Sequence, residues 1–400
     1  MRRLNQLPER DFLKLFFAAF SLSFLLAAFV MPDRADMLPG LWRILSSPTK
    51  ATTNFFSLGG YAATFLNMWP TMLGVVLHCI VKREKLGTHT NAMLFSTGLA
   101  PFISELMVRY PSAEPVGFNP GGVVLALAVG IFAGFFLPAG LDNSPKIHKG
   151  FALYSAALPV GMTAFFLHGI LYKAPGVAVP EAVGELHFAE PVIVNGFCLA
   201  LFSGFVLAAL LMGCTWWDYW KLMTDPDPVV NFSATYGNAT MLMNVGLYGL
   251  YILLYYNLIG AEFNGVTFGV IFCMLSTCNS GSHPGNIWPL TLGYSMASQL
   301  FQRIAPLVGG DYVQYLHSQS IIVGLCYANG LSPIADKYGW FYGFCAAMAH
   351  FCMVTTVPQL HGGMCLYNGG FTAALVCLLM LPSLERHFRT KRERRGMDSK

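Results

Sequence analysis

Charged residues are scarce in this chain of 400 residues. Lys, Arg, Asp and Glu together make up 11% of it, whereas hydrophobic residues make up 55%. Soluble domains carry about 25% charged residues. The chain therefore has too little charge to cover a water-facing surface, which excludes an ordinary soluble protein and indicates one embedded in lipid.

The motifs of common enzyme classes are also missing. The chain has no Walker loop, no H-E-x-x-H, no G-x-S-x-G and no G-x-G-x-x-G after a strand. Its ten cysteines lie almost all in apolar runs without metal-type C-x-x-C pairs, which is typical of small core residues. We therefore expect no enzyme, no cofactor and no metal site. The weaker alternative is a membrane-embedded Ser or Cys nucleophile that acts together with His283, in the turn-forming loop NSGSHPGN.

Long apolar runs are abundant. Runs of roughly 18 to 25 residues recur along the chain, and about 20 are needed to cross a hydrocarbon core as a helix. The sequence predicts an all-α, polytopic membrane protein with about twelve membrane segments. The expected segments are residues 11–31, 54–81, 88–108, 119–141, 150–172, 192–215, 231–259, 264–279, 286–303, 314–335, 338–358 and 364–384. It stays open whether some segments span the membrane or only re-enter it, namely 88–108 or the pair 264–279 and 286–303.

The basic residues predict the orientation. The run at 11–31 is too long for a signal peptide and lacks an A-x-A cleavage site before PDRAD, so we interpret it as a retained first helix. With twelve spans and both termini inside, 18 of the 24 Lys and Arg residues lie on the inner side. We expect an inner cell membrane location with both termini cytoplasmic. The basic tail 386–400 is then an anchor and not a nucleic-acid site.

The chain also contains an internal repeat. NFFSLGGYAATFLN, residues 54–67, aligns without gaps on NFSATYGNATMLMN, residues 231–244, and four further short matches follow in the same order. This register predicts a first repeat at 51–220 and a second at 221–385, after the N-terminal tail, first helix and loop at 1–50. An odd number of helices separates the two starts, so the second copy is expected to be inverted.

A second register is also visible. Asn67-Met-Trp-Pro70 resembles Asn286-Ile-Trp-Pro289, and Gly98-Leu-Ala-Pro101 resembles Gly330-Leu-Ser-Pro333. We favour the first register, because it covers more of the chain.

The two halves, the block FNPGGVVLALAVGIFAGFFLPAG at 118–140 and the block LHGGMCLYNGGFTAAL resemble a bacterial multi-pass membrane family of unknown function, domain of unknown function 1576. This resemblance implies a duplicated membrane domain and no particular chemistry. FNGVTFG and YNGGFTA give a looser likeness to urea-transporter-type channels, whose halves carry N-G helix starts near a pore. That likeness is an analogy of fold type.

Polar residues at the ends of apolar helices are the candidate binding groups. Histidine and asparagine side chains can hydrogen-bond a solute that has lost its water, and they occur here at matching places in the two halves. The predicted substrate-binding residues are His168, His361, Asn195, Asn368, Asn67, Asn244, Asn91 and Asn264. We expect them to converge near a pseudo-twofold axis. The alternative is that they cap helix ends and bridge neighbouring helices.

Charge is rare inside the predicted segments, which bears on mechanism. Glu105 is the one carboxylate well inside an apolar run, and Arg109 follows at i+4, so we expect a salt bridge there rather than a proton relay. The best-fitting function is a transporter or channel-like facilitator for a small polar solute, with sodium coupling left open. A non-transporting membrane assembly protein is the second candidate and a membrane enzyme the third. Homo-oligomerisation stays open.

A reporter enzyme fused after Lys400 tests the orientation. We expect it to be active only in the cytoplasm, because the tail alone carries seven basic residues. A fusion that is active only outside the cell contradicts the predicted topology.

Overall fold

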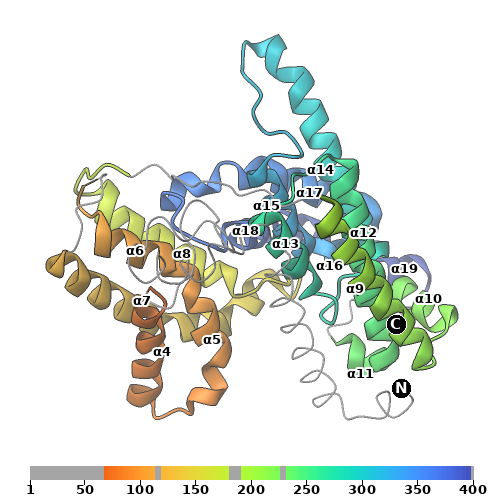
Figure 1. Ribbon diagram of the computed structural model, residues 1–400, viewed down its shortest axis with the longest axis horizontal. Coiled ribbons are helices and arrows are strands. Elements are labelled where there is room, and N and C mark those ends of the chain that lie inside the picture. The colour runs from red at the N-terminus through yellow and green to blue at the C-terminus, as the bar shows by residue number, and fades with distance from the viewer. Residues whose placement is uncertain (1–66, 113–118, 180–190, 226–230, 398–400) are drawn as a thin grey trace. The chain divides into compact units, whose positions relative to one another are not determined.

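The computed structural model describes residues 67–112, 119–179, 191–225 and 231–397, and within these ranges the chain is helical without β-strands (Figure 1). The predicted all-α class is therefore confirmed. The expected first helix at 11–31 and residues 54–66 of the expected segment 54–81 lie outside the described residues. The chain divides into two compact units. Of the described residues, unit 1 comprises 191–225, 231–351 and 379–397, and unit 2 comprises 67–112, 119–179 and 352–378.

Unit 2 contains the N-terminal described helices. In chain order they are α4 (Trp69–Lys82), the 3-10 turn η1 (Leu86–His89), α5 (Thr90–Phe95), the 3-10 turn η2 (Ser96–Leu99), α6 (Ala100–Val108), α7 (Pro120–His148), α8 (Ala157–His168) and the π-turn η3 (Gly169–Lys173). The 3-10 turn η6 (Val357–His361) and the first half of α18 (Asn368–His387) complete it.

Unit 1 contains the remaining helices. They are α9 (Pro191–Leu211), α10 (Trp216–Thr224), α11 (Phe232–Tyr236), α12 (Asn238–Leu258), α13 (Gly265–Leu275), α14 (Pro284–Ile304), η4 (Ala305–Val308), α15 (Gln319–Ala328), η5 (Asn329–Leu331), α16 (Ser332–Tyr338), most of α17 (Trp340–Val354), the end of α18 and α19 (Lys391–Arg394). Within this unit α9 lies along α12 (Figure 1).

Several of these helices are long and apolar enough to cross a bilayer. In the described residues they are Leu86–Val108, Pro120–His148, Pro191–Leu211, Asn238–Leu258 and Asn368–Arg394. Within α7 and α9, a window of 18 residues has a mean hydropathy of 2.3 and 2.2, and both helices expose large apolar side chains. Such surfaces suit lipid and not water. The chain therefore has the features of a membrane protein, whereas the number of twelve segments stays a prediction.

Glycines set the distance between α4 and α7, which pack side by side in unit 2 (Figure 1). A Cβ atom on Gly134 would lie 1.9 Å from the Thr71 carbonyl oxygen, and one on Gly74 would lie 2.3 Å from the Ile131 carbonyl oxygen. These distances leave no room for a methyl group. Small residues that allow backbones to approach are the usual contact between membrane helices.

Two stretches of the chain follow the same order of elements. The order α4, η1, α5, η2, α6, α7 in unit 2 recurs as α14, η4, α15, η5, α16, α17, with α14 to α16 in unit 1. In each, the second 3-10 turn ends at the leucine of Gly-Leu-x-Pro, and the proline is the second residue of the next helix. Proline has no N–H and disfavours helical backbone in the residue before it, which explains the interruption.

Neighbouring groups bond to both interruptions, to the backbone at η2 and to a side chain at η5. The Gly98 carbonyl at η2 accepts a hydrogen bond from the Leu366 N–H at 3.0 Å. At η5, the Asn329 side chain accepts from the Tyr248 hydroxyl at 2.5 Å and donates to the Thr277 hydroxyl at 2.8 Å. Irregular backbone at membrane depth is tolerated only where protein or water supplies such partners.

Matching hydrogen bonds accompany the matching elements. Asn67 donates to the Ser104 hydroxyl at 2.8 Å, and Asn286 donates to the Asp336 carboxylate at 2.6 Å. Both acceptors lie three residues after the proline of Gly-Leu-x-Pro. These contacts and the element order follow the second register, in which Asn67 corresponds to Asn286.

We expect Gly134→Ala to lower the thermal unfolding midpoint of the purified protein in detergent, because the new methyl group must force α4 and α7 apart. Gly204→Ala is the matched control, since Gly204 lies inside α9 with no atom within 4 Å of an added Cβ. Removing a helical glycine normally stabilises by up to about 1 kcal/mol. Equal midpoints for the two variants would contradict the close contact.

Candidate functional site

Two histidines meet at the ends of apolar helices in unit 2. His168 is the last residue of α8, where the chain passes into the π-turn η3, and His361 is the last residue of η6. Both are buried, with 2% and 0% of their surface exposed. Gly362 makes the approach possible: it has φ +59°, and an added Cβ would lie 3.1 Å from Cδ2 of His168. The sequence therefore needs glycine here for its backbone and for space.

The partners of the two rings decide which nitrogen carries the proton. His168 Nδ1 lies 2.9 Å from the Leu360 carbonyl oxygen, which only accepts, so Nδ1 is protonated. The Asn368 amide nitrogen donates to the Val354 carbonyl at 3.4 Å, so its oxygen accepts from His361 Nε2 at 3.0 Å. In the neutral rings, His168 Nε2 and His361 Nδ1 are then acceptors. Neither atom has a hydrogen-bond partner among the described residues.

Two further polar side chains extend this group. Tyr172, in η3, stacks on His168 with ring centroids 5.8 Å apart, and its hydroxyl is buried without a hydrogen-bond partner in the described structure. Glu105, in α6, is 1% exposed, and its carboxylate is close enough to the Tyr172 hydroxyl to interact electrostatically. We call Glu105, His168, Tyr172, His361 and Asn368 the unit 2 polar cluster.

The salt bridge expected between Glu105 and Arg109 is present but long. Arg109 Nη1 lies 3.8 Å from Glu105 Oε1. Charge-assisted hydrogen bonds are about 2.7–2.9 Å long. Both carboxylate oxygens consequently have no hydrogen bond within the described part of the chain. The ion pair therefore leaves the hydrogen-bonding capacity of the carboxylate unused.

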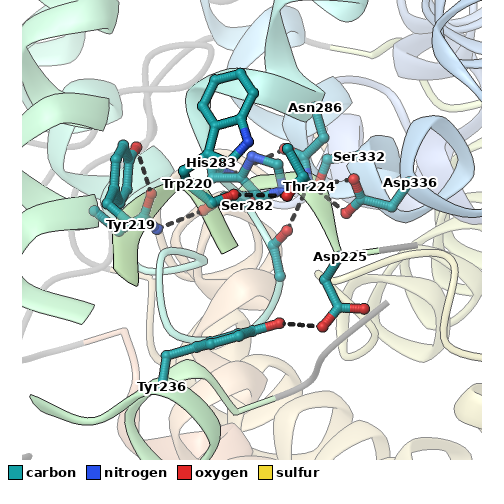
Figure 2. Close-up of polar contacts among 12 residues, drawn as sticks. Tyr219, Trp220, Thr224, Asp225, Tyr236, Ser282, His283, Asn286, Ser332 and Asp336 are labelled. Atoms are coloured by element: carbon teal, nitrogen blue, oxygen red, sulfur yellow. Dashed lines mark hydrogen bonds and ion pairs between the residues drawn. The ribbon is translucent and has the colours of Figure 1, made fainter. Parts of the chain in front are cut away.

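A second buried polar group lies in unit 1, at the start of α14 (Figure 2). The Asn286 amide nitrogen donates to the Gly281 carbonyl at 2.7 Å and to Asp336 Oδ2 at 2.6 Å, while its oxygen accepts from the His283 backbone N–H at 2.9 Å. His283 Nε2 lies 3.5 Å from Asp336 Oδ1. These bonds fasten the loop before α14 to α16.

The same loop is held from its other side by Asn244 of α12. The Asn244 amide nitrogen donates to the carbonyls of Cys278 and Ser282 at 3.0 and 2.8 Å, and its oxygen accepts from the Tyr219 hydroxyl at 3.3 Å. Ser282 pairs with the Ser332 hydroxyl at 3.1 Å (Figure 2). Asn244, Tyr219, Ser282 and Ser332 each have a structural partner, whereas His283 Nδ1 has no hydrogen-bond partner among the described residues. The Ser or Cys nucleophile considered for NSGSHPGN stays a prediction.

The other predicted asparagines have separate surroundings. Asn67 is buried on Ser104, the neighbour of Glu105, whereas Asn91 is exposed on α5. Asn195 pairs with Asn257 at the end of α12, with amide contacts of 3.0 and 2.7 Å. Asn264 caps α13 by accepting from the Thr267 N–H at 2.9 Å and donates to Gln319 at 2.6 Å.

Of the eight predicted residues, His168, His361 and Asn368 form one contact group in unit 2. Asn195, Asn244 and Asn264 belong to unit 1. Asn244 lies thirteen residues before Asn257 in α12, about 20 Å along the helix axis. Asn195 and Asn244 therefore lie far apart along α12, so the eight residues do not all meet at one place, and the role of each in substrate binding stays a prediction.

Tyr172 is the member of the cluster that the sequence reasoning missed. Its position four residues after His168 is a usable signal, because residues at i and i+4 lie on one face of a helix. Glu105 was singled out, but its proximity to Tyr172 depends on packing between α6 and η3, which no local pattern encodes.

An apolar groove of about 400 Å³ also lies in unit 2, along α7, α8 and α18. Its lining is Phe136, Leu137, Gly140, Asn143, Ile147, Leu158, Pro159, Met162, Thr163, Leu375 and Leu378. The lining is mainly apolar and includes none of the eight predicted residues, so the groove suits lipid better than a polar solute.

The chain belongs to a family described as "Protein of unknown function (DUF1576)", because the family model matches residues 65–173 and 213–386, more than half of the chain. The resemblance found in the sequence is thereby confirmed. No curated protein and no solved structure matches the chain. The looser likeness to urea-transporter-type channels stays an analogy.

We expect Asp336→Ala to destabilise the protein by about 1–3 kcal/mol, because the buried Asn286 amide loses an acceptor. Asp142→Ala is the control, since Asp142 is exposed on α7 and such changes usually stay within about 0.5 kcal/mol. Thermal unfolding in detergent measures both. If Asp336→Ala behaves like the control, the loop before α14 does not depend on this bond.

Proposed function

We propose that the protein is a membrane transporter or channel-like facilitator for a small polar solute, and that the unit 2 polar cluster binds the solute. The observation that carries this proposal is the set of buried atoms without hydrogen bonds: both oxygens of Glu105, Nε2 of His168, the hydroxyl of Tyr172 and Nδ1 of His361. Each such atom costs about 1–3 kcal/mol if nothing pairs with it. Water or a solute at this place would supply the missing partners.

The cluster favours one class of solute. The two imidazole lone pairs and the carboxylate all accept hydrogen bonds, and the Tyr172 hydroxyl can do so as well. A solute with several N–H donors, such as an amide, an amine or an ammonium ion, fits this excess of acceptors. A solute that is mainly a hydrogen-bond acceptor would leave these atoms unpaired.

The backbone around the cluster supports transport over a purely structural role. A π-turn follows His168, a 3-10 turn ends at His361, and η2 interrupts the helix that carries Glu105. Broken membrane helices next to buried polar groups are the usual construction of transporter binding sites.

The proposal extends to two related halves. The recurring element order and the paired bonds of Asn67 and Asn286 support a duplication in the second register. Seven of the expected segments separate the starts of the two copies, and an odd number inverts the second copy. Inversion, twelve segments and the cytoplasmic position of both termini remain parts of this proposal.

Purified protein in liposomes tests the function. We expect flux of a donor-rich solute above that of empty liposomes, in a panel of neutral polar solutes, amino acids, amines and inorganic cations. His361→Ala should lower the flux per folded molecule several-fold, because one hydrogen bond is worth about 1 kcal/mol and 1.4 kcal/mol is tenfold in affinity. His387→Ala is the control, since His387 is exposed at the end of α18.

Two outcomes would favour other functions. If no compound passes faster than through empty liposomes, the membrane assembly protein becomes the better description. If His361→Ala lowers the unfolding midpoint but leaves flux per folded molecule unchanged, the histidines only join helices.

Glu105 bears on coupling. Neutral histidines alone would not require a proton cycle, but the Glu105 carboxylate interacts with Tyr172, whose ring stacks on His168, and a carboxylate can exchange a proton with the pathway. A pH gradient imposed on the liposomes should change uptake by the wild type and not by Glu105→Gln. Equal responses of the two proteins would indicate passive flux.

A further inference from the structure

We propose that His78, Glu84 and His89 form a site for a divalent transition-metal ion of the Zn²⁺ type at the C-terminal end of α4. This site is separate from the unit 2 polar cluster and does not rest on the proposed transport. Its three side chains come from a short stretch of chain, HCIVKREKLGTH, that contains no familiar metal motif.

The turn after α4 brings the three side chains together. α4 ends at Lys82, and Arg83 adopts the left-handed conformation with φ +56°, which reverses the chain. The Glu84 N–H then donates to the Cys79 carbonyl at 2.9 Å, so Glu84 lies against the last turn of α4. The 3-10 turn η1 ends at His89 and returns that side chain to the same place.

The spacing of the ligand atoms suits one ion. One nitrogen or oxygen from each residue lies within 4.8 Å of the others. Glu84 Oε2 is 2.5 Å from His89 Nε2 and 3.9 Å from His78 Nε2. Tetrahedral zinc, with bonds of roughly 2.0–2.1 Å, holds its ligand atoms about 3.3 Å apart. Small side-chain movements would therefore bring the three atoms onto one ion.

The hydrogen bond of His78 leaves its other ring nitrogen available to a metal ion. Its Nδ1 lies 2.8 Å from the Phe135 carbonyl oxygen, which accepts, so Nδ1 is the donor. Nε2 therefore faces a Glu84 carboxylate oxygen at 3.9 Å. A metal ion between these two atoms would bind to both.

The same bond is a typical support for a metal ligand. Metal-binding histidines usually donate their other ring N–H to a carbonyl or carboxylate, which fixes the orientation of the ring. His78 is only 7% exposed, and the Phe135 ring also packs on it edge-to-face at 5.3 Å. Its position is therefore fixed before any ion arrives.

The ligand set favours zinc-like ions. Two imidazoles and one carboxylate, with a further position open to solvent, are a common ligand set for Zn²⁺, whereas Ca²⁺ and Mg²⁺ prefer oxygen ligands alone. The Glu84 side chain is 46% exposed, so the ion has access from outside. A plain surface ion pair would also fit the 2.5 Å contact between Glu84 and His89, but it does not involve His78, whose Nε2 faces the same carboxylate oxygen.

Metal binding by the full-length protein in detergent tests the proposal. After removal of any affinity tag and treatment with a chelator, the protein is titrated with Zn²⁺ by calorimetry, and with Co²⁺ by its visible absorption. We expect one Zn²⁺ per chain at this site and a tetrahedral-type Co²⁺ spectrum. Glu84→Gln and His89→Ala should each weaken binding by roughly 100-fold or more and abolish the Co²⁺ spectrum.

The side chains of Glu84 and His89 are 46% and 12% exposed, so both are less buried than the His78 residue, and these two variants keep the test valid even if removing His78 disturbs folding. His317→Ala is the matched control, because His317 stacks on Tyr315 in the loop before α15. It should bind Zn²⁺ like the wild type. Wild-type protein that binds no Zn²⁺, or Glu84→Gln and His89→Ala variants that bind it unchanged, would overturn the proposal.

Discussion

Hydrogen-bond satisfaction inside an apolar medium is the constraint on which this structure depends. Hydrocarbon offers no partner to a carbonyl, an amide or an imidazole, so each helix interruption needs a partner from the protein. The protein supplies such partners: the Leu366 N–H donates to the Gly98 carbonyl, and the hydroxyls of Tyr248 and Thr277 bond to the Asn329 side chain. The interruptions at η2 and η5 are therefore parts of the packing and not defects in it.

The two buried polar groups meet this constraint differently. In unit 1 the Asp336 carboxylate accepts from Asn286, and Asn244 uses its amide nitrogen and its oxygen on the same loop. In unit 2, Asn67 bonds to Ser104 instead, and the carboxylate stands one residue later, at Glu105, without a hydrogen bond in the described structure. A carboxylate that accepts a hydrogen bond from its own chain, as Asp336 does from Asn286, stiffens a joint. A group with unused acceptors can exchange partners, which is what solute binding requires.

Much of the fold could be predicted from the sequence, because run length alone identifies a membrane helix. The expected segment at 192–215 is α9, and the one at 119–141 lies in α7. The register of the repeat is harder to predict from the sequence. The first register, which we favoured, depends on short local matches such as Asn67 with Asn244, yet Asn67 precedes α4 and Asn244 lies inside α12. The contacts that follow the second register, Asn67 with Ser104 and Asn286 with Asp336, join residues far apart in the chain.

The candidate site was predictable only in part, for the same reason. His168, His361 and Asn368 could be named, because each polar residue stands beside a glycine at the end of an apolar run. The tautomers of the two histidines could not, since they depend on the carbonyl of Leu360 and on the amide orientation of Asn368. Those contacts turn two ordinary helix-end histidines into acceptors. Whether a buried histidine joins helices or binds a solute is thus decided by which of its nitrogens the neighbouring backbone and side chains already use.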